Sequence, residues 1–111
     1  SKLEKETIFK IREMLEMDID SYSVYKYGLY VSSVVGSIKG ISYKEINDIY
    51  SNLVIYSRKD IKVGGMDIAN ALKREPGNYL REIFDDIERK IIGLEIDNKY
   101  EDIIDYVKKN Y

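Results

Sequence analysis

Apolar residues in this chain recur at steps of three and four, and a single proline, Pro76, interrupts the pattern. The clearest stretch runs from Leu80 to Ile91, where apolar residues form one stripe opposite charged residues. Stripes of the same period cover residues 3–15, 24–38, 46–54, 66–73 and 100–107. The spacing therefore predicts an all-α fold, a compact and non-idealised bundle of about five to six short helices.

The same stripes predict the core. We expect these side chains to face inward: Leu3, Ile8, Ile11, Leu15, Val24, Tyr27, Val31, Val34, Val35, Ile38, Ile46, Ile49, Tyr50, Leu53, Val54, Leu80, Ile83, Phe84, Ile87, Ile91, Tyr100, Ile103, Ile104 and Val107. Tyrosine is frequent, with 11 residues in the chain, and seven of them lie between Tyr22 and Tyr56. Helical spacing makes most of them half-buried, with the hydroxyl at the rim of the core.

Several residues predict where helices begin and end. Gly40 is expected to end the second helix. Ser42 precedes Glu45 by three residues, which is the spacing of a capping box. Asn98 precedes Glu101 by the same interval and predicts a cap for the last helix.

The composition excludes several kinds of catalytic or metal site. The chain has no Cys and no His, so it lacks a thiol nucleophile, a Cys-ligated zinc site and the usual general base at neutral pH. The pair Asp18 and Asp20 has a spacing that holds metals on strands, but here it follows an amphipathic stretch. A helix-end turn is the favoured interpretation, because acidic residues before a helix complement its dipole. We expect no metal or cofactor in this chain.

The charges are unevenly distributed. The whole chain carries a net charge of −2, whereas residues 57–81 carry six basic and three acidic residues, and residues 82–111 carry five basic and nine acidic ones. A basic stretch of this size is typical of an ordinary solvated surface, but it is also the place where a nucleic-acid contact would lie.

No apolar run approaches the ~20 residues that span a bilayer, and the first residues form no signal-peptide core. The chain starts at Ser1 rather than Met, which suggests the cut edge of a fragment or a cloning remnant. We expect a cytoplasmic protein, or a piece of one.

Three short motifs carry a family resemblance. Residues 61–68 read Ile-Lys-Val-Gly-Gly-Met-Asp-Ile, a Pro-Gly pair precedes an apolar helix over residues 76–84, and residues 98–104 read Asn-Lys-Tyr-Glu-Asp-Ile-Ile. In this order and spacing they resemble the C-terminal region of bacterial CCA-adding enzymes, tRNA nucleotidyltransferases of the poly(A)-polymerase-like family. Asn78 and Arg81 depart from that pattern, which has Pro and Gly there.

The resemblance implies a single helical region over residues 1–111, body-like over 1–57 and tail-like over 58–111. The family's catalytic head and nucleotide-reading neck motifs are missing here, so the chain alone is expected not to be an enzyme. A longer parent would be a nucleotidyltransferase that uses Mg²⁺, CTP and ATP. By the same resemblance, the tail holds the tRNA elbow so that the 3′ end reaches the distant active site.

The expected RNA contacts lie in the basic stretch. They are the cations Arg58, Lys59, Lys62, Lys73, Arg74 and Arg81, with Gly64, Gly65 and Asn78 as backbone or polar contributors. For the two glycines a purely structural role is equally expected. The alternative function is a helical module for protein–protein interaction or homodimerisation. It would use the Tyr- and Ile-rich first half and would not bind RNA.

Overall fold

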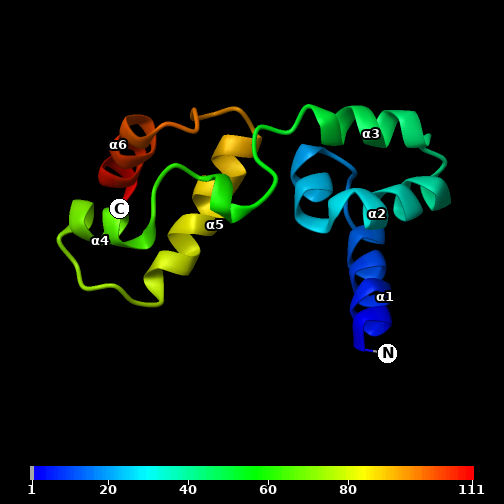
Figure 1. Cartoon of the computed structure of the whole chain (residues 1–111), viewed down its shortest axis with the longest axis horizontal. Helices are drawn as coiled ribbons and strands as arrows, with labels where there is room; N and C mark the ends of the chain where they lie inside the picture. The colour runs from blue at the N-terminus through cyan, green and yellow to red at the C-terminus, as the bar shows by residue number, and fades with distance from the viewer. Residues whose placement is uncertain (1) are drawn as a thin grey trace. The chain divides into compact units, whose positions relative to one another are not determined.

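The computed structural model describes residues 2–111 and confirms the predicted all-α fold. Within that range the chain forms six α-helices, one short 3₁₀ helix and no strand (Figure 1). The elements are α1 (Lys2–Leu15), α2 (Ser21–Lys39), α3 (Tyr43–Ser51), η1 (Arg58–Asp60), α4 (Gly65–Leu72), α5 (Tyr79–Ile92) and α6 (Tyr100–Asn110). The helices fall into two compact units, which meet in the sequence between Leu53 and Val54.

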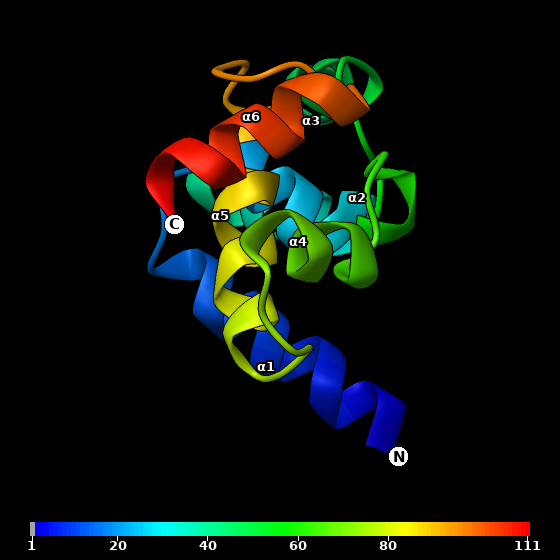
Figure 2. The same cartoon turned by 90° about the vertical axis from the view of Figure 1, so that its left-hand side faces the viewer.

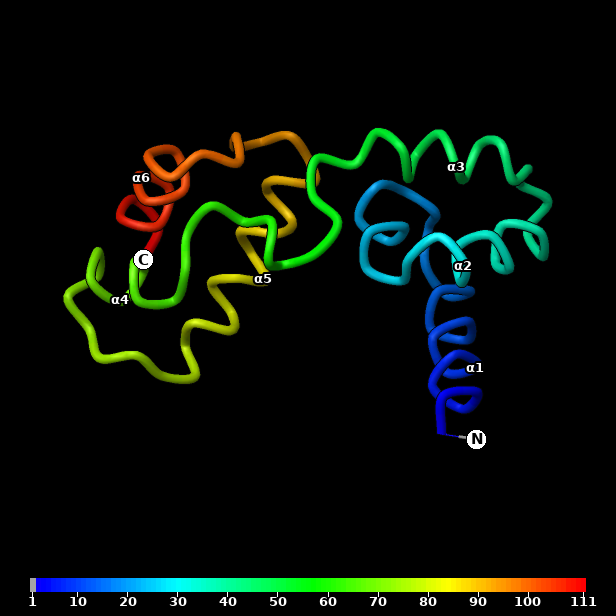
Figure 3. The backbone as a smooth tube through the Cα atoms, viewed as in Figure 1, coloured from blue at the N-terminus to red at the C-terminus, as the bar shows by residue number. Residues whose placement is uncertain are grey.

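The first unit contains α1, α2 and α3, and α2 packs against both of its neighbours. Figure 3 shows α2 and α3 side by side, joined by a short turn. That turn begins at Gly40, which has φ 81° and ψ 22°, as the predicted helix end requires. The Ser42 hydroxyl then accepts a hydrogen bond from the Glu45 N–H at 3.2 Å, which confirms Ser42 as the cap of α3.

The start of α2 explains the acidic pair that precedes it. The Asp20 carboxylate accepts from the Ser23 N–H at 2.9 Å, and the Ser23 hydroxyl accepts from the Asp20 N–H at 2.9 Å. This reciprocal capping box confirms the helix-end interpretation of Asp18 and Asp20. No group of three or more acidic residues within the described chain is arranged to hold a metal ion.

The ends of the predicted apolar stripes are more exposed than expected. In α1 the buried side chain is Met14, whereas Leu3 and Ile8 are 73% and 51% exposed. The predicted burial of these two residues is therefore wrong. The contacts of α1 with α2 come from its C-terminal end, where the Glu13 carboxylate accepts a 3.4 Å hydrogen bond from the Tyr27 hydroxyl.

Other helix ends show the same effect. Ile38, Val54 and Tyr100 are exposed and Val34 is half-buried, although their spacing predicted an inward position. Each exposed residue lies at or just beyond the end of a helix, where no neighbouring element covers the stripe.

The second unit contains η1, α4, α5 and α6, and α4 packs on both α6 and α5 (Figure 2). Its core is formed by buried aliphatic side chains, as predicted for α5 and α6. They are Ile68, Ile83, Ile87, Ile91, Ile103 and Val107. None of the described helices is long and apolar enough to cross a bilayer.

Candidate nucleic-acid interface

The basic segment, as we call residues 58–65, contains η1 and the connection from η1 to the first residue of α4. Within it Ile61 and Val63 are buried, at 7% and 5% exposure, whereas Lys59 and Lys62 are exposed. The buried aliphatic side chains attach the segment to the core of the second unit. The two lysines are thereby held on the outer side of an anchored backbone, and within residues 2–111 no ion pair engages them.

Arg58 is occupied by an internal ion pair. Its Nη2 lies 2.5 Å from Oε1 of Glu88, a carboxylate whose side chain is 10% exposed, and it also donates to Asp85. The hydrogen bond with Glu88 is the largest of the influences that raise the pKa of Arg58. The charge count over residues 57–81 did not include these two partners from α5, so the local surface at Arg58 is less basic than that count suggested.

Asn98 joins the basic segment to the start of α6. Its Nδ2 donates to the Asp60 carbonyl at 2.8 Å, and its Oδ1 accepts from the Lys62 N–H at 3.0 Å. The prediction that Asn98 caps α6 is wrong. The N-cap position belongs to Lys99, and the Asn98 amide is engaged with a segment 36 to 38 residues earlier in the chain.

The two glycines lie where the segment enters α4. The Gly64 N–H donates to the Asp67 carboxylate at 2.7 Å, so Asp67 caps the start of α4. This bond engages the N–H through which Gly64 would otherwise contact a phosphate. A Cβ added at Gly65 would lie 3.4 Å from Leu80 Cδ1, so a small residue suits the approach of α4 to the first turn of α5.

A shallow depression of about 540 Å³ lies along the basic segment. It is lined by Arg58, Lys59, Ile61, Lys62, Val63, Gly64 and Phe84. The structure thus brings together four of the predicted contact residues. The Arg58 guanidinium also lies 5.8 Å from the centre of the Phe84 ring.

The other predicted contact residues follow α4. Lys73 ends that helix with φ 56° and ψ 43°, and the Arg74 guanidinium lies 3.8 Å from the centre of the Tyr79 ring. Asn78 precedes α5, and Arg81 lies one turn before Asp85, on the same side of that helix. The spacing of apolar residues did not predict that Arg74 stacks on Tyr79.

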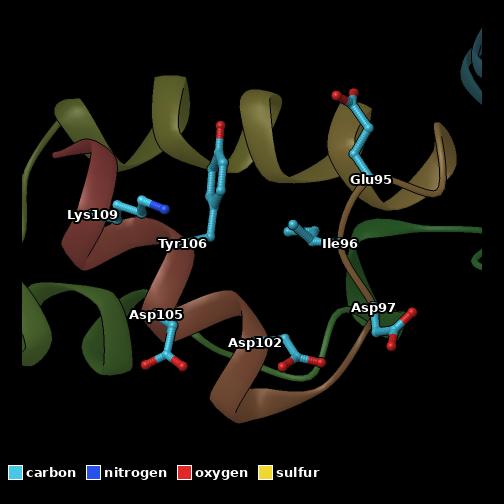
Figure 4. Close-up of a pocket in the computed structure, with 7 residues that line it drawn as sticks. All are labelled: Glu95, Ile96, Asp97, Asp102, Asp105, Tyr106 and Lys109. Atoms are coloured by element: carbon cyan, nitrogen blue, oxygen red, sulfur yellow. The ribbon is translucent and has the colours of Figure 1, made fainter.

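A second depression, of about 440 Å³, lies beside α6 and has the opposite charge (Figure 4). Asp102 and Asp105 line it from α6, together with Glu95 and Asp97 from the preceding loop. Tyr106 points from this site toward α5, where its hydroxyl donates to Asp86 at 2.5 Å. The four carboxylates repel a phosphate backbone, which argues against this depression as a surface for RNA.

The fold is all-α, and the basic segment on its surface is held by hydrogen bonds from Asn98. The chain belongs to the family described as tRNA nucleotidyltransferase domain 2, which matches residues 3–107. It is similar to the CCA-adding enzyme of Bacillus mycoides (strain KBAB4), with 24% identity over 110 residues that cover 92% of this chain and 28% of the relative. The CCA-adding enzyme of Ligilactobacillus salivarius (strain UCC118) is 29% identical over 99 residues, covering 85% and 24%.

A solved structure has the same fold. The crystal structure of the Bacillus stearothermophilus CCA-adding enzyme in complex with CTP matches 94% of this chain and 30% of that chain, with a TM-score of 0.83 and 16% identity. The predicted family resemblance is therefore confirmed, and it extends over the first half of the chain as well. The chain spans about a quarter of the length of these CCA-adding enzymes.

Proposed function

We propose that this chain is a non-catalytic tRNA-binding region of a CCA-adding type of tRNA nucleotidyltransferase, which holds the tRNA elbow. The observation that carries the proposal is the basic segment, where Lys59 and Lys62 project from a backbone fixed by buried side chains. Family membership and the CCA-adding relatives support it. Nucleotide transfer, with Mg²⁺, CTP and ATP, would then belong to a part of the parent enzyme outside these residues.

The chemistry of the surface fits a phosphate contact better than base readout. Lys59 and Lys62 are exposed point charges, and ammonium groups of this kind bind phosphate oxygens without regard to sequence. Double-stranded RNA is recognised mainly by its shape and backbone, because its deep, narrow major groove cannot be read by side chains. Lys73, Arg74, Asn78 and Arg81 would extend the same contact along the connection from α4 to α5.

The proposal is tested by removing charge in matched pairs. In the double variant Lys59→Gln/Lys62→Gln we expect weaker tRNA binding and a slope of log affinity against log salt that is lower by about one to two. The control Lys108→Gln/Lys109→Gln removes the same charge from α6, in the same unit, and should leave the slope unchanged. Charge reversal of Lys73 and Arg74 should weaken binding in the same way.

Backbone amide NMR of the labelled chain locates the contact. With tRNA added at low salt, shifts should cluster in residues 58–81 and disappear as salt is raised. If that stretch is silent and the lysine variants bind like the original chain, the tRNA-binding function of this region is wrong.

One observation favours a second function, protein–protein interaction through the first unit. Leu3, Ile8 and Phe9 on α1 are 73%, 51% and 62% exposed, so apolar surface on this helix is open to a partner. An interaction module of this kind would show a mass that rises with concentration and would be indifferent to tRNA. Sedimentation of the original chain and of an Ile8→Ser/Phe9→Ser variant distinguishes the two functions.

A further inference from the structure

The Asn98 side chain makes two hydrogen bonds to the backbone of the basic segment. It donates to the Asp60 carbonyl and accepts from the Lys62 N–H, so it pairs with the backbone on both sides of Ile61 as a neighbouring strand would. Asn98 therefore fixes the backbone next to buried Ile61, close to the two exposed lysines. The side chain of Asn98 itself is half-buried.

The hydrogen bonding of Asn98 is directed at the segment rather than at its own helix. The N-cap of α6 is Lys99, and no side-chain cap bond is formed there. An exposed extended stretch without such a partner would sample many backbone conformations. The Asp60 carboxylate adds a local restraint, because it accepts from the Tyr56 N–H at 2.8 Å and the Ser57 N–H at 3.2 Å.

We propose that Asn98 is a positioning residue for RNA binding, which pre-orders the backbone that carries Lys59 and Lys62. The inference rests on the proposed function, since it concerns the same surface. Asn98 contributes no charge and touches no phosphate in this scheme. It raises affinity because a segment that is already ordered loses less conformational freedom when it binds.

The test compares Asn98→Ala with Asn110→Ala. Asn110 is a matched control in the same unit, because its Nδ2 also donates to a backbone carbonyl, that of Tyr106, at 2.8 Å. We expect Asn98→Ala to lower tRNA affinity about five- to tenfold, the effect of freeing about one residue, with an unchanged salt slope. Asn110→Ala should bind like the original chain.

The lysine variants separate this inference from the function on which it rests. If Lys59→Gln/Lys62→Gln lowers affinity and slope while Asn98→Ala matches the Asn110→Ala control, the positioning role is wrong and the tRNA contact stands. If neither lysine nor asparagine variants change binding, the proposed function itself is wrong. A reduced salt slope in Asn98→Ala would also overturn the inference, because positioning changes affinity without changing the number of phosphate contacts.

A measurement on the unmodified chain guards against a variant that fails to fold. Hydrogen exchange of the Lys62 amide should be slowed relative to that of an unprotected peptide, since Asn98 accepts its hydrogen bond. Exchange at the unprotected rate would overturn the inference without any substitution. Asn98→Leu, which keeps the size of the side chain but neither hydrogen bond, should repeat the affinity loss of Asn98→Ala.

Discussion

The Nη2 atom of Arg58 lies 2.5 Å from Oε1 of Glu88, and it joins the exposed start of the basic segment to a carboxylate on α5 that is 8% exposed as a whole residue. A buried carboxylate is stable only when its charge is compensated, so the ion pair is part of the packing of the second unit. Arg58 therefore stabilises the fold of the second unit, whether or not it also contacts RNA.

Replacing Arg58 by Met should destabilise the chain by about 1.5–3 kcal/mol, because it removes a charge-assisted hydrogen bond from buried Glu88. Urea unfolding followed by circular dichroism measures the change. Lys90→Met is the control, since the Lys90–Glu95 pair is longer, at 3.5 Å, and more exposed, and its loss should be worth at most ~1 kcal/mol. Equal effects in the two variants would contradict the structural role of Arg58.

Gly36 of α2 lies against Ile46 of α3, and Gly36→Ala should destabilise the first unit by about 1–3 kcal/mol. The new Cβ would lie 2.9 Å from Cγ1 and 3.1 Å from Cδ1 of Ile46, a fully buried side chain. Ile46→Val removes one of these atoms, so the double variant should lose less stability than the two single effects combined. Simple additivity in thermal unfolding would show that the contact does not limit packing.

Gly28 interrupts α2 with φ 83° and ψ 170°, a backbone region that only glycine adopts without strain. Gly28→Ala should therefore destabilise the chain by about 1–3 kcal/mol, even though no atom lies within 4 Å of the new Cβ. Gly77→Ala is the matched control, because its Cβ would make only ordinary contacts and its φ is not positive. If both variants have the same midpoint in urea, the bend of α2 does not depend on Gly28.

Two tyrosine hydroxyls converge on Asp86, and they predict a loss of stability in alkali. Tyr106 and Tyr111 donate to this carboxylate at 2.5 and 2.7 Å. Burial, followed by the hydrogen bond to Asp86, raises the pKa of Tyr111 from 10.0 to about 12 and raises that of Tyr106 as well. Because the folded-state pKa exceeds the unfolded one, the stabilisation is fully present below pH 10 and is lost as the pH rises through the folded-state values.

Tyrosinate absorbance and the thermal midpoint, both followed from pH 9 to 12, check this prediction. The late-titrating fraction should shrink in Tyr111→Phe, and the fall of the midpoint above pH 10 should be shallower in Asp86→Asn. Titration of every tyrosine near pH 10 in the original chain would refute the pairing with Asp86.

The helices could be predicted from sequence because their apolar stripes are regular, and Ile83, Ile87 and Ile91 are buried as expected. The extent of burial could not be predicted at helix ends. Periodicity shows which side of a helix is apolar, but it does not show how far a neighbour reaches along that side. Leu3 and Ile8 lie on a predicted stripe of α1 and are exposed, whereas the buried residue of that helix is Met14, near its C-terminal end.

The site was predicted as a stretch of charge, and the structure resolves it into residues with different roles. Lys59 and Lys62 are exposed, whereas Arg58 pairs with two carboxylates about 30 residues away in sequence. The role of Asn98 was also hidden, because its local spacing to Glu101 indicates a helix cap. Arg58 pairs with side chains and Asn98 with the backbone, and in both cases the partners are distant in sequence. A count of charges along the chain does not show such interactions.

Buried and exposed side chains alternate along the basic segment, so the number of residues in it is critical. Ile61 and Val63 are buried, while Lys62 between them is exposed. The Asn98 side chain forms hydrogen bonds with the peptide groups on both sides of Ile61. Deleting Ile61 would move Lys62 into the position of the buried isoleucine, so that a charged side chain would face the core. Residues 73–78, which connect α4 to α5, are exposed, and within the described chain no side chain pairs with their backbone as Asn98 does with the basic segment. We therefore expect an insertion after Lys73 to be tolerated far better than a one-residue deletion next to Lys62.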